Sequence, residues 1–258
     1  MQLQFCKYQG TGNDFILIDN RTVQISLTRT QIAALCHRRF GIGADGLMML
    51  ETAIYADFKM VYYNSDGNES TMCGNGGRCI VAFAHQLGII EHHTTFEAVD
   101  GLHQAEIDSK GIVRLQMIDV NGVLEDEEAK ILQTGSPHYV LWVDDVEKVD
   151  VVREGRKIRN RTQYLPDGIN VNFVSLRSDG LHIRTYERGV EDETLSCGTG
   201  VTAAAIASVE NQQGAFSIQV HTQGGTLRVN FEKTIHQTAS KVWLIGPTAL
   251  VFKGEVNI

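Results

Sequence analysis

The feature that most constrains the fold of this chain is a short segment that occurs twice. Met72-Cys73-Gly74-Asn75-Gly76 and Ser196-Cys197-Gly198-Thr199-Gly200 share the pattern Cys-Gly-x-Gly and lie 124 residues apart. A pattern this short recurs by chance, but other segments keep the same separation, which is the signature of an internal repeat. In sequential order these are Phe15-Ile16-Leu17 with Tyr139-Val140-Leu141, Ala44-Asp45-Gly46 with Gly168-Ile169-Asn170, Glu69 with Glu193, and Asp100-Gly101 with Gly224-Gly225.

The repeat predicts that the 258-residue chain contains two copies of one unit. We expect one lobe over residues 1–120 and a second over 121–249, joined near Asp119–Glu128, where turn-forming and charged residues show no periodicity. Toward the end of each copy the separation between matching segments is five residues larger, as Val113-Arg114-Leu115 and Val242-Trp243-Leu244 show.

Strands dominate the pattern within each copy. Apolar residues alternate over Phe58–Tyr63 and Leu181–Tyr186, and opening strands are expected at Phe15–Asp19 and Tyr139–Val143. Helices are expected over Thr30–Arg39, with Arg38 and Arg39 on a charged outer face, over Val152–Arg159, and after each Cys-Gly-x-Gly turn. The last two are apolar on nearly every side, so we expect sheet to cover them. The predicted fold class is α+β, with two pseudo-symmetric lobes, each a curved, mixed, barrel-like β-sheet around a central helix.

Composition excludes several classes of protein. The formal net charge is −8, from 23 Lys and Arg against 31 Asp and Glu, and no basic stripe is present to neutralise phosphates, so nucleic acid is not an expected partner. No apolar run approaches the ~20 residues that cross a bilayer, and the N-terminus does not resemble a secretory signal. Five cysteines without metal-ligand spacing indicate free thiols and no metal site. We therefore expect a cytoplasmic protein that does not bind membranes.

The paired turns point to acid–base chemistry. A cysteine at a helix start lies beside unpaired N–H groups and the positive end of the helix dipole, which favours the thiolate. The glycines let the backbone amides approach an anion such as a carboxylate. Two such turns could place one α-carbon between Cys73 and Cys197, so that one sulfur removes a proton and the other supplies one on the opposite face. Such an inversion needs neither a metal nor pyridoxal phosphate.

Ordinary structural roles explain other residues of the same types. Cys6, Cys36 and Cys79 have no repeat partner and are expected in the core, where free cysteine is common. His138 follows Pro137 in an expected loop, and its position opposite Asp14 in the repeat is the only reason to place it in a pocket. Glu187 and Arg188 end a strand, where charged residues are usually solvated.

With these motifs identified, the sequence resembles the diaminopimelate epimerase family from end to end. The resembling segments are Gly10–Phe15 (GTGNDF), Gly41–Gly46 (GIGADG), Asn64–Gly67 (NSDG), Met72–Cys79 (MCGNGGRC), Tyr186–Gly189 (YERG) and Ser196–Gly200 (SCGTG). The resemblance implies a cofactor-independent epimerase that interconverts LL- and meso-2,6-diaminopimelate in lysine and peptidoglycan-precursor biosynthesis. It also implies that the C-terminal strand, about residues 250–258, returns to the first lobe.

The resemblance further implies a role for each matching residue. Cys197 accepts the proton and Cys73 donates one when the LL isomer reacts, and the roles exchange in reverse. His138 and Glu187 tune the two thiols. The substrate-binding positions implied are Asn13, Asn64, Gly74, Asn75, Asn170, Glu187, Arg188, Gly198 and Thr199. Gly46 and Ser136 depart from a glutamine and an asparagine common in the family, at positions that contact the distal end of the substrate.

Two alternatives remain at this point. Cys-Gly-x-Gly alone would equally suit a proline or hydroxyproline racemase, and a non-catalytic thiol switch could use Cys73 and Cys197 as a redox pair. The expected partner is a small amino-acid substrate, diaminopimelate, with no cofactor. Both a monomer and a homodimer are compatible with the sequence.

Overall fold

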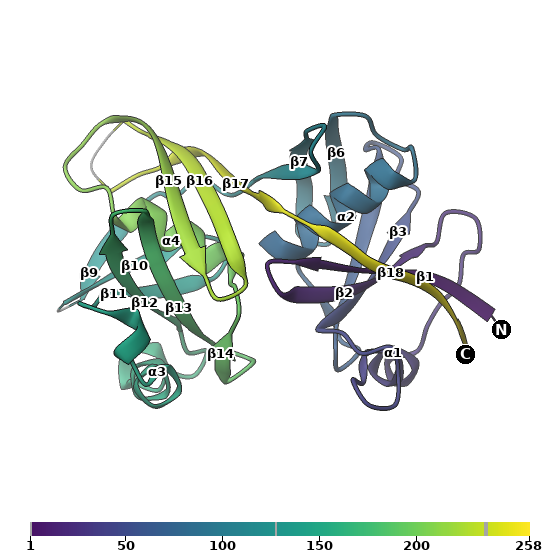
Figure 1. Ribbon diagram of the computed structural model, residues 1–258, viewed down its shortest axis with the longest axis horizontal. Coiled ribbons are helices and arrows are strands. Elements are labelled where there is room, and N and C mark those ends of the chain that lie inside the picture. The colour runs from purple at the N-terminus through teal and green to yellow at the C-terminus, as the bar shows by residue number, and fades with distance from the viewer. Residues whose placement is uncertain (1, 127, 235–236) are drawn as a thin grey trace. The chain divides into compact units, whose positions relative to one another are not determined.

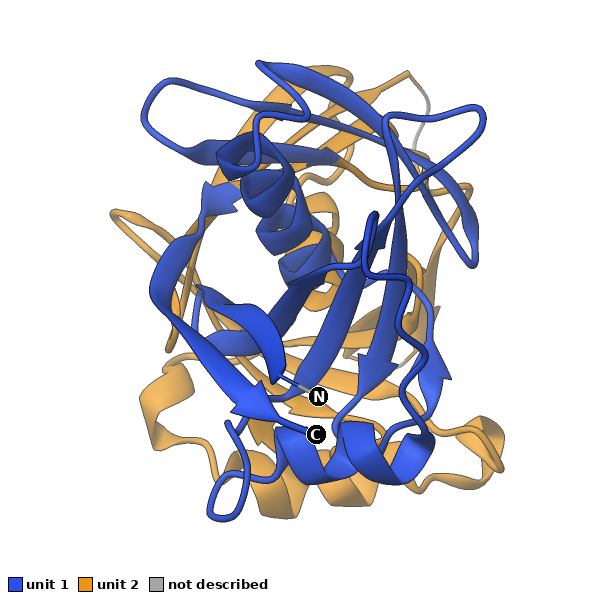
Figure 2. Cartoon of the chain, turned by 90° about the vertical axis from the view of Figure 1, so that its right-hand side faces the viewer, with its two compact units in different colours: residues 1–115, 246–258 blue, residues 116–245 orange. Residues whose placement is uncertain are grey.

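The computed structural model describes residues 2–126, 128–234 and 237–258, and the chain forms two compact units (Figure 2). Unit 1 runs to Leu115 and includes Gly246–Ile258, and unit 2 comprises Gln116–Ile245. Glu127, within the stretch expected to join the copies, lies outside the described residues, as do Met1, Ile235 and His236.

In its described residues, unit 1 contains nine strands and two helices, and some neighbouring strands, such as β1 and β18, are far apart in the sequence (Figure 1). The helices are α1 (Arg29–Cys36) and α2 (Gly74–Gln86). The strands are β1 (Gln2–Gly10), β2 (Asn13–Asp19), β3 (Gly46–Glu51), β4 (Phe58–Asn64), β5 (Glu69–Ser70), β6 (His93–Ala98), β7 (Gly101–Ile107), β8 (Ile112–Gln116) and β18 (Ala249–Asn257). Neighbouring strands are antiparallel except for the pairs β2–β3 and β4–β6, which are parallel. The C-terminal strand β18 pairs antiparallel with β1.

Unit 2 repeats this arrangement strand for strand. Its strands are β9 (Val123–Asp126), β10 (Ala129–Gln133), β11 (Pro137–Trp142), β12 (Asn170–Arg177), β13 (Gly180–Glu187), β14 (Asp192–Thr194), β15 (Gly214–Thr222), β16 (Gly225–Lys233) and β17 (Ser240–Pro247). The helices are α3 (Val151–Arg159) and α4 (Gly198–Ala207), with 3₁₀ turns at Val146–Lys148 and Thr162–Tyr164. The parallel pairs are β11–β12 and β13–β15, the counterparts of β2–β3 and β4–β6.

The predicted repeat and the α+β fold class are confirmed. Helices α2 and α4 begin at Gly74 and Gly198, which are 124 residues apart, and the strand pairings around them correspond. Almost every residue of α4 is buried, because strands β10–β13, β15 and β16 contact it. A helix of Ala, Val and Ile has no polar face to offer water, so this surrounding sheet is what stabilises it.

Several expectations about local structure were wrong. Helix α1 ends at Cys36 rather than Arg39, because the backbone of His37 is extended (φ −67°, ψ 119°). Arg38 therefore lies outside the helix, where it forms ion pairs with Asp14 and Asp45. His138 lies within strand β11, not in a loop, and strand β9 falls in the stretch expected to lack regular structure.

None of the helices in the described residues is long and apolar enough to span a bilayer.

Candidate active site

In unit 1, the centre of the candidate site is the start of helix α2. Cys73 is the N-cap residue, with an extended backbone (φ −109°, ψ 148°), and its Sγ accepts a hydrogen bond from the Gly76 amide at 3.2 Å. The sulfur thus occupies the place that a serine or aspartate oxygen usually takes at a helix start. Gly74 and Asn75 form the first turn and are buried. This geometry allows the helix to stabilise negative charge on the sulfur.

A buried arginine lies beneath this turn. Arg78 is 0% exposed and donates to Gly74 O at 3.1 Å, Thr11 Oγ1 at 3.3 Å and Asn75 Oδ1 at 3.0 Å, which are all neutral acceptors. Burial lowers the pKa of Arg78 to about 10, so the guanidinium stays cationic at neutral pH. By holding Asn75 Oδ1, Arg78 leaves Asn75 Nδ2 to donate to Asn13 Oδ1 at 3.4 Å. Arg78 was not predicted as a site residue, although it lies within the resembling segment.

The other predicted residues of unit 1 lie at strand ends. Asn13 begins β2 and donates to Asp45 Oδ2 at 2.7 Å. Asn64 ends β4, is exposed, and pairs in register with Gly46. A Cβ atom at Gly46 would lie 2.5 Å from Tyr62 Cε2 and 2.7 Å from Tyr63 O. This explains why glycine rather than glutamine occupies position 46.

In unit 2, at the start of helix α4, the hydroxyl of Thr199 lies between Cys197 and His138. Cys197 is the N-cap residue, is 8% exposed, and has its Sγ 3.4 Å from Thr199 Oγ1. His138 Nε2 lies 2.8 Å from the same oxygen. The Thr134 hydroxyl donates to Thr199 O at 2.9 Å and fixes the backbone there. His138 is 0% exposed, and burial lowers its pKa to about 3, so the imidazole is neutral at physiological pH.

Asn170, Arg188 and Ser136 form a second polar group in unit 2. Asn170 Nδ2 donates to Ser136 Oγ at 2.8 Å, and the Arg188 amide donates to Asn170 Oδ1 at 3.0 Å. Arg188 Nη2 lies 3.4 Å from the same serine oxygen, so Ser136 contacts both residues directly. Glu187, at the end of β13, accepts a hydrogen bond from the Thr194 hydroxyl at 2.9 Å.

The remaining cysteines lie in the core, as predicted. Cys6, Cys36 and Cys79 are 8%, 2% and 0% exposed. Burial raises the pKa of the Cys36 thiol to about 11 and raises those of Cys6 and Cys79 as well. These thiols are protonated at neutral pH and unsuited to proton transfer.

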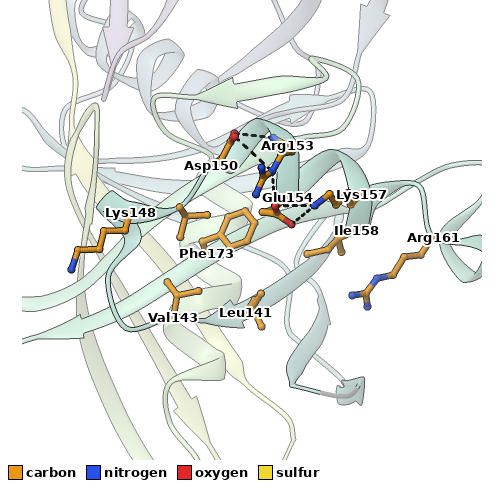
Figure 3. Close-up of a pocket in the computed structure, with 11 residues that line it drawn as sticks. Leu141, Val143, Lys148, Asp150, Arg153, Glu154, Lys157, Ile158, Arg161 and Phe173 are labelled. Carbon is orange, nitrogen blue, oxygen red and sulfur yellow. Dashed lines mark hydrogen bonds and ion pairs between the residues drawn. The ribbon is translucent and has the colours of Figure 1, made fainter.

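Two other features of unit 2 do not include the predicted residues. A pocket lies between α3 and strands β11 and β12, where Leu141, Phe173 and Ile158 form an apolar floor beside the ion pairs of Glu154 (Figure 3). Among the described residues, one group could hold a metal ion: Asp179, His182 and His221, whose candidate ligand atoms lie within 4.8 Å of one another. The two imidazoles stack at 4.6 Å, and each Nε2 is already hydrogen-bonded to Asp179.

Comparison with solved structures defines the class of fold. A PhzF-family phenazine biosynthesis protein from Bacillus anthracis superposes with a TM-score of 0.75 at 16% identity, covering 100% of both chains. A hydroxyproline epimerase from Agrobacterium vitis superposes with a TM-score of 0.72 at 15% identity, covering 99% of this chain and 92% of that one. The two-unit fold is therefore the one shared by these proteins.

Sequence comparison identifies the family. The family model for diaminopimelate epimerase matches residues 5–121 and 131–250. A diaminopimelate epimerase from Flavobacterium psychrophilum is 52% identical over 98% of this chain and 100% of its own length. Another from Chlorobaculum tepidum is 44% identical over 96% of this chain and 99% of its own length. The chain belongs to the diaminopimelate epimerase family.

Proposed function

We propose that the chain is an isomerase that interconverts LL- and meso-2,6-diaminopimelate without a cofactor, with Cys73 and Cys197 as its two acid–base groups. The observation that carries the proposal is that, in a member of this family, both cysteines are the N-cap residues of matched buried helices. Both sulfurs thus lie at the positive end of a helix, which favours a thiolate, although only the Cys73 sulfur accepts a hydrogen bond from a helix amide. The other three cysteines are in the core and have raised pKa values.

The proton moves in two steps. With the LL isomer bound, the Cys197 thiolate removes the α-proton from one face of the reacting carbon and becomes a thiol. The electron pair of the C–H bond passes to the carbanion, which is delocalised onto the adjacent carboxylate. The Cys73 thiol then gives its proton to the opposite face and becomes a thiolate. The meso product has the inverted configuration, and the reverse reaction exchanges the roles of the two sulfurs.

The carboxylate next to the reacting carbon gains negative charge in this reaction. The backbone amides of Gly74, Asn75, Gly198 and Thr199 lie in the first turns of α2 and α4, and the first turn of a helix is a favourable place for an anion. Preorganised donors of this kind stabilise developing charge without reorganisation. These amides are our candidates for holding the reacting carboxylate.

Diaminopimelate has a second amino-acid group, which must be held away from the sulfurs. We assign this task to Asn13, Asn64, Asn170, Glu187 and Arg188. Arg188 offers a planar fork for a carboxylate, and its fixed contacts with Asn170 and Ser136 support that role. An analogue that lacked the distal group would leave these polar atoms unpaired, which disfavours its binding strongly. We place the reaction in the cytoplasm, and both a monomer and a homodimer are compatible with it.

The test is an assay of the purified, reduced protein in D₂O. With LL-diaminopimelate and no added cofactor, we expect deuterium at the α-position and formation of the meso isomer. Proline and trans-4-hydroxyproline in parallel test the racemase alternative, and we expect no exchange into either. Exchange into proline alone, or none into any substrate, would overturn the proposal.

Oxidation distinguishes the redox-switch alternative. A catalytic pair needs free thiols, so activity should fall on oxidation of Cys73 and Cys197 and return with reductant. Titration of free thiols alongside the assay measures this, and full activity with both sulfurs oxidised would contradict a catalytic role for them.

A further inference from the structure

Asn172, in strand β12, has a buried side chain whose orientation is fixed by its partners. It is 0% exposed. The Tyr139 carbonyl oxygen, which can only accept, lies 3.1 Å from Nδ2, and the Thr185 hydroxyl donates to Oδ1 at 3.0 Å. The amide of Asn172 must therefore point its nitrogen at the Tyr139 carbonyl and its oxygen at the Thr185 hydroxyl. This leaves the second hydrogen of Nδ2 for the remaining neighbour, His138.

The contact between Asn172 and His138 determines which ring nitrogen of His138 carries the proton. Asn172 Nδ2 lies 3.1 Å from His138 Nδ1. Since Nδ2 can only donate, Nδ1 must accept, and a neutral imidazole then carries its hydrogen on Nε2. A proton on Nδ1 would set two hydrogens against each other in a site without water access.

The Nε2 hydrogen in turn orients the hydroxyl of Thr199. His138 Nε2 donates to Thr199 Oγ1 at 2.8 Å, so the threonine hydrogen cannot point at the ring. Cys197 Sγ lies 3.4 Å from the same oxygen and is in position to receive it. With the other tautomer, Nε2 would accept from Thr199, and the sulfur would lose this donor.

We propose that Asn172 is a positioning residue that holds His138 in the Nε2–H tautomer and thereby directs the Thr199 hydroxyl at the sulfur of Cys197. The structural part of this proposal stands on hydrogen-bond geometry alone. Its consequence for catalysis rests on the proposed function, in which the Cys197 thiolate removes the substrate proton.

Two further observations support the arrangement. Burial outweighs the hydrogen bond with Asn172 and lowers the pKa of His138 to about 3, so the ring remains neutral. Gly200 provides the space, because a Cβ atom there would collide with Asn172 Oδ1 and approach His138 Cε1 to 3.4 Å. At the matching position of unit 1, the residue is Met48, so this relay belongs to unit 2 alone among the described residues.

The first experiment measures the tautomer in the unmodified protein. Nitrogen-15 NMR distinguishes a protonated from an unprotonated ring nitrogen, and the His138→Gln variant identifies which of the nine histidines gives the signal. Between pH 5 and 8 we expect Nε2 protonated and Nδ1 unprotonated. A proton on Nδ1 in that range would overturn the proposal. No substrate is involved, so this result does not depend on the proposed function.

The second experiment measures the reactivity of Cys197 in variants. Alkylation of the peptide containing Cys197, followed by mass spectrometry across pH, gives the titration midpoint of its thiol. Asn172→Leu keeps the size of the side chain but removes its donor, and we expect the midpoint to rise by about half to one unit, since a lost hydrogen bond to a charged atom costs roughly tenfold. Thr199→Val, which removes the hydroxyl, should shift it at least as far.

The matched control is Asn20→Leu, at another buried asparagine. Asn20 lies in unit 1 and is held by Ile25 O at 3.1 Å and Glu51 at 2.9 Å, so its loss tests general destabilisation without touching the relay. An unshifted midpoint in folded Asn172→Leu or Thr199→Val, or an equal shift in Asn20→Leu, would contradict the proposal. If Asn172→Leu does not fold, the tautomer in the unmodified protein decides the question.

Discussion

The two units share their strand pairings and helix starts but differ in the polar residues around each cysteine. In unit 1, Arg78 Nη1 donates to Gly74 O at 3.1 Å; at the matching position of unit 2, the Thr202 hydroxyl donates to Gly198 O at 2.9 Å. A buried cation in one copy thus corresponds to a neutral hydroxyl in the other.

Asp14 and His138 occupy matching positions of the repeat, and there too the two units differ in charge. Hydrogen bonds from Arg38 and Lys7 outweigh burial and lower the pKa of Asp14 to about 2, so unit 1 keeps an ionised carboxylate there. Unit 2 keeps a neutral imidazole instead. The comparison shows that both cysteines are N-cap residues but that their sulfurs have different hydrogen-bond partners: the Gly76 amide for Cys73 and the Thr199 hydroxyl for Cys197.

The largest expected effect comes from removing either sulfur. Cys73→Ser and Cys197→Ser should each lower kcat by about 10³-fold or more, because a serine hydroxyl is far too weak an acid to replace a thiol in proton transfer. Steady-state epimerase assays measure this. Cys36→Ala, in the core of unit 1, is the control and should retain kcat per folded molecule within about twofold. Equal losses in all three variants would indicate a folding defect instead.

Acid should destabilise the two units in different pH ranges. The folded-state pKa of His138 is about 3, below its value of about 6.5 in the unfolded chain, so its stabilising contribution is present above pH 6.5 and is lost as the pH falls toward 3. The loss is about 1.4 kcal/mol for each pH unit in that window. For Asp14, whose pKa of about 2 lies below the ordinary carboxyl value, the loss begins only below about pH 4.

Urea unfolding monitored by tryptophan fluorescence follows the unit that contains His138, because Trp142 and Trp243 both belong to unit 2. The free energy of unfolding should fall between pH 6.5 and 4.5, and His138→Gln should flatten that dependence. An identical pH dependence in the variant would contradict the assignment of a neutral, buried His138.

Alanine at the two matched glycines should have unequal effects on stability. In Gly200→Ala, the new methyl group collides with Asn172, which three hydrogen bonds hold in place, and we expect a loss of about 1–3 kcal/mol in the free energy of unfolding. In Gly76→Ala, the methyl group lies 3.0 Å from Cys73 Sγ and from the flexible end of Met48, so we expect a smaller loss. Urea denaturation compares the two, and a larger loss for Gly76→Ala would reverse the comparison.

The smallest effect is expected for Ser136→Ala. This change removes the oxygen that contacts Asn170 and Arg188 but leaves the sulfurs untouched. We expect KM for diaminopimelate to rise a few-fold with little change in kcat, because the loss concerns substrate binding rather than the transition state. A fall in kcat with unchanged KM would place Ser136 in the chemical step instead.

The sequence was sufficient to predict the architecture because the repeat constrains the backbone. One separation aligned the strands, the helix starts and the two cysteines, and alternation of apolar residues located β4 and β13 closely. Helix α1 was predicted too long because Arg38 and Arg39 were interpreted as its charged outer face. The ion pairs of Arg38 with Asp14 and Asp45 instead connect residues that are distant in sequence.

The buried polar contacts were not predicted because they too join residues that are distant in sequence. Asn172 looks like one polar residue in an alternating strand, and only the fold places it against His138. Arg78 looks like the charged face of a helix, but it is fully buried. In both cases, a single polar residue within an apolar segment was the feature of the sequence that could have indicated a buried polar contact.

The central claim, that two sulfurs serve opposite faces of one carbon, is tested most directly by tracing the hydrogen in the first turnovers. LL-diaminopimelate is converted in D₂O, and product and remaining substrate are analysed by mass spectrometry at low conversion. With two acid–base groups, the meso product carries one solvent deuterium while the remaining substrate keeps its α-hydrogen, because different sulfurs remove and supply the proton. A meso product that retains the original α-hydrogen would show one group acting on both faces and would contradict the account.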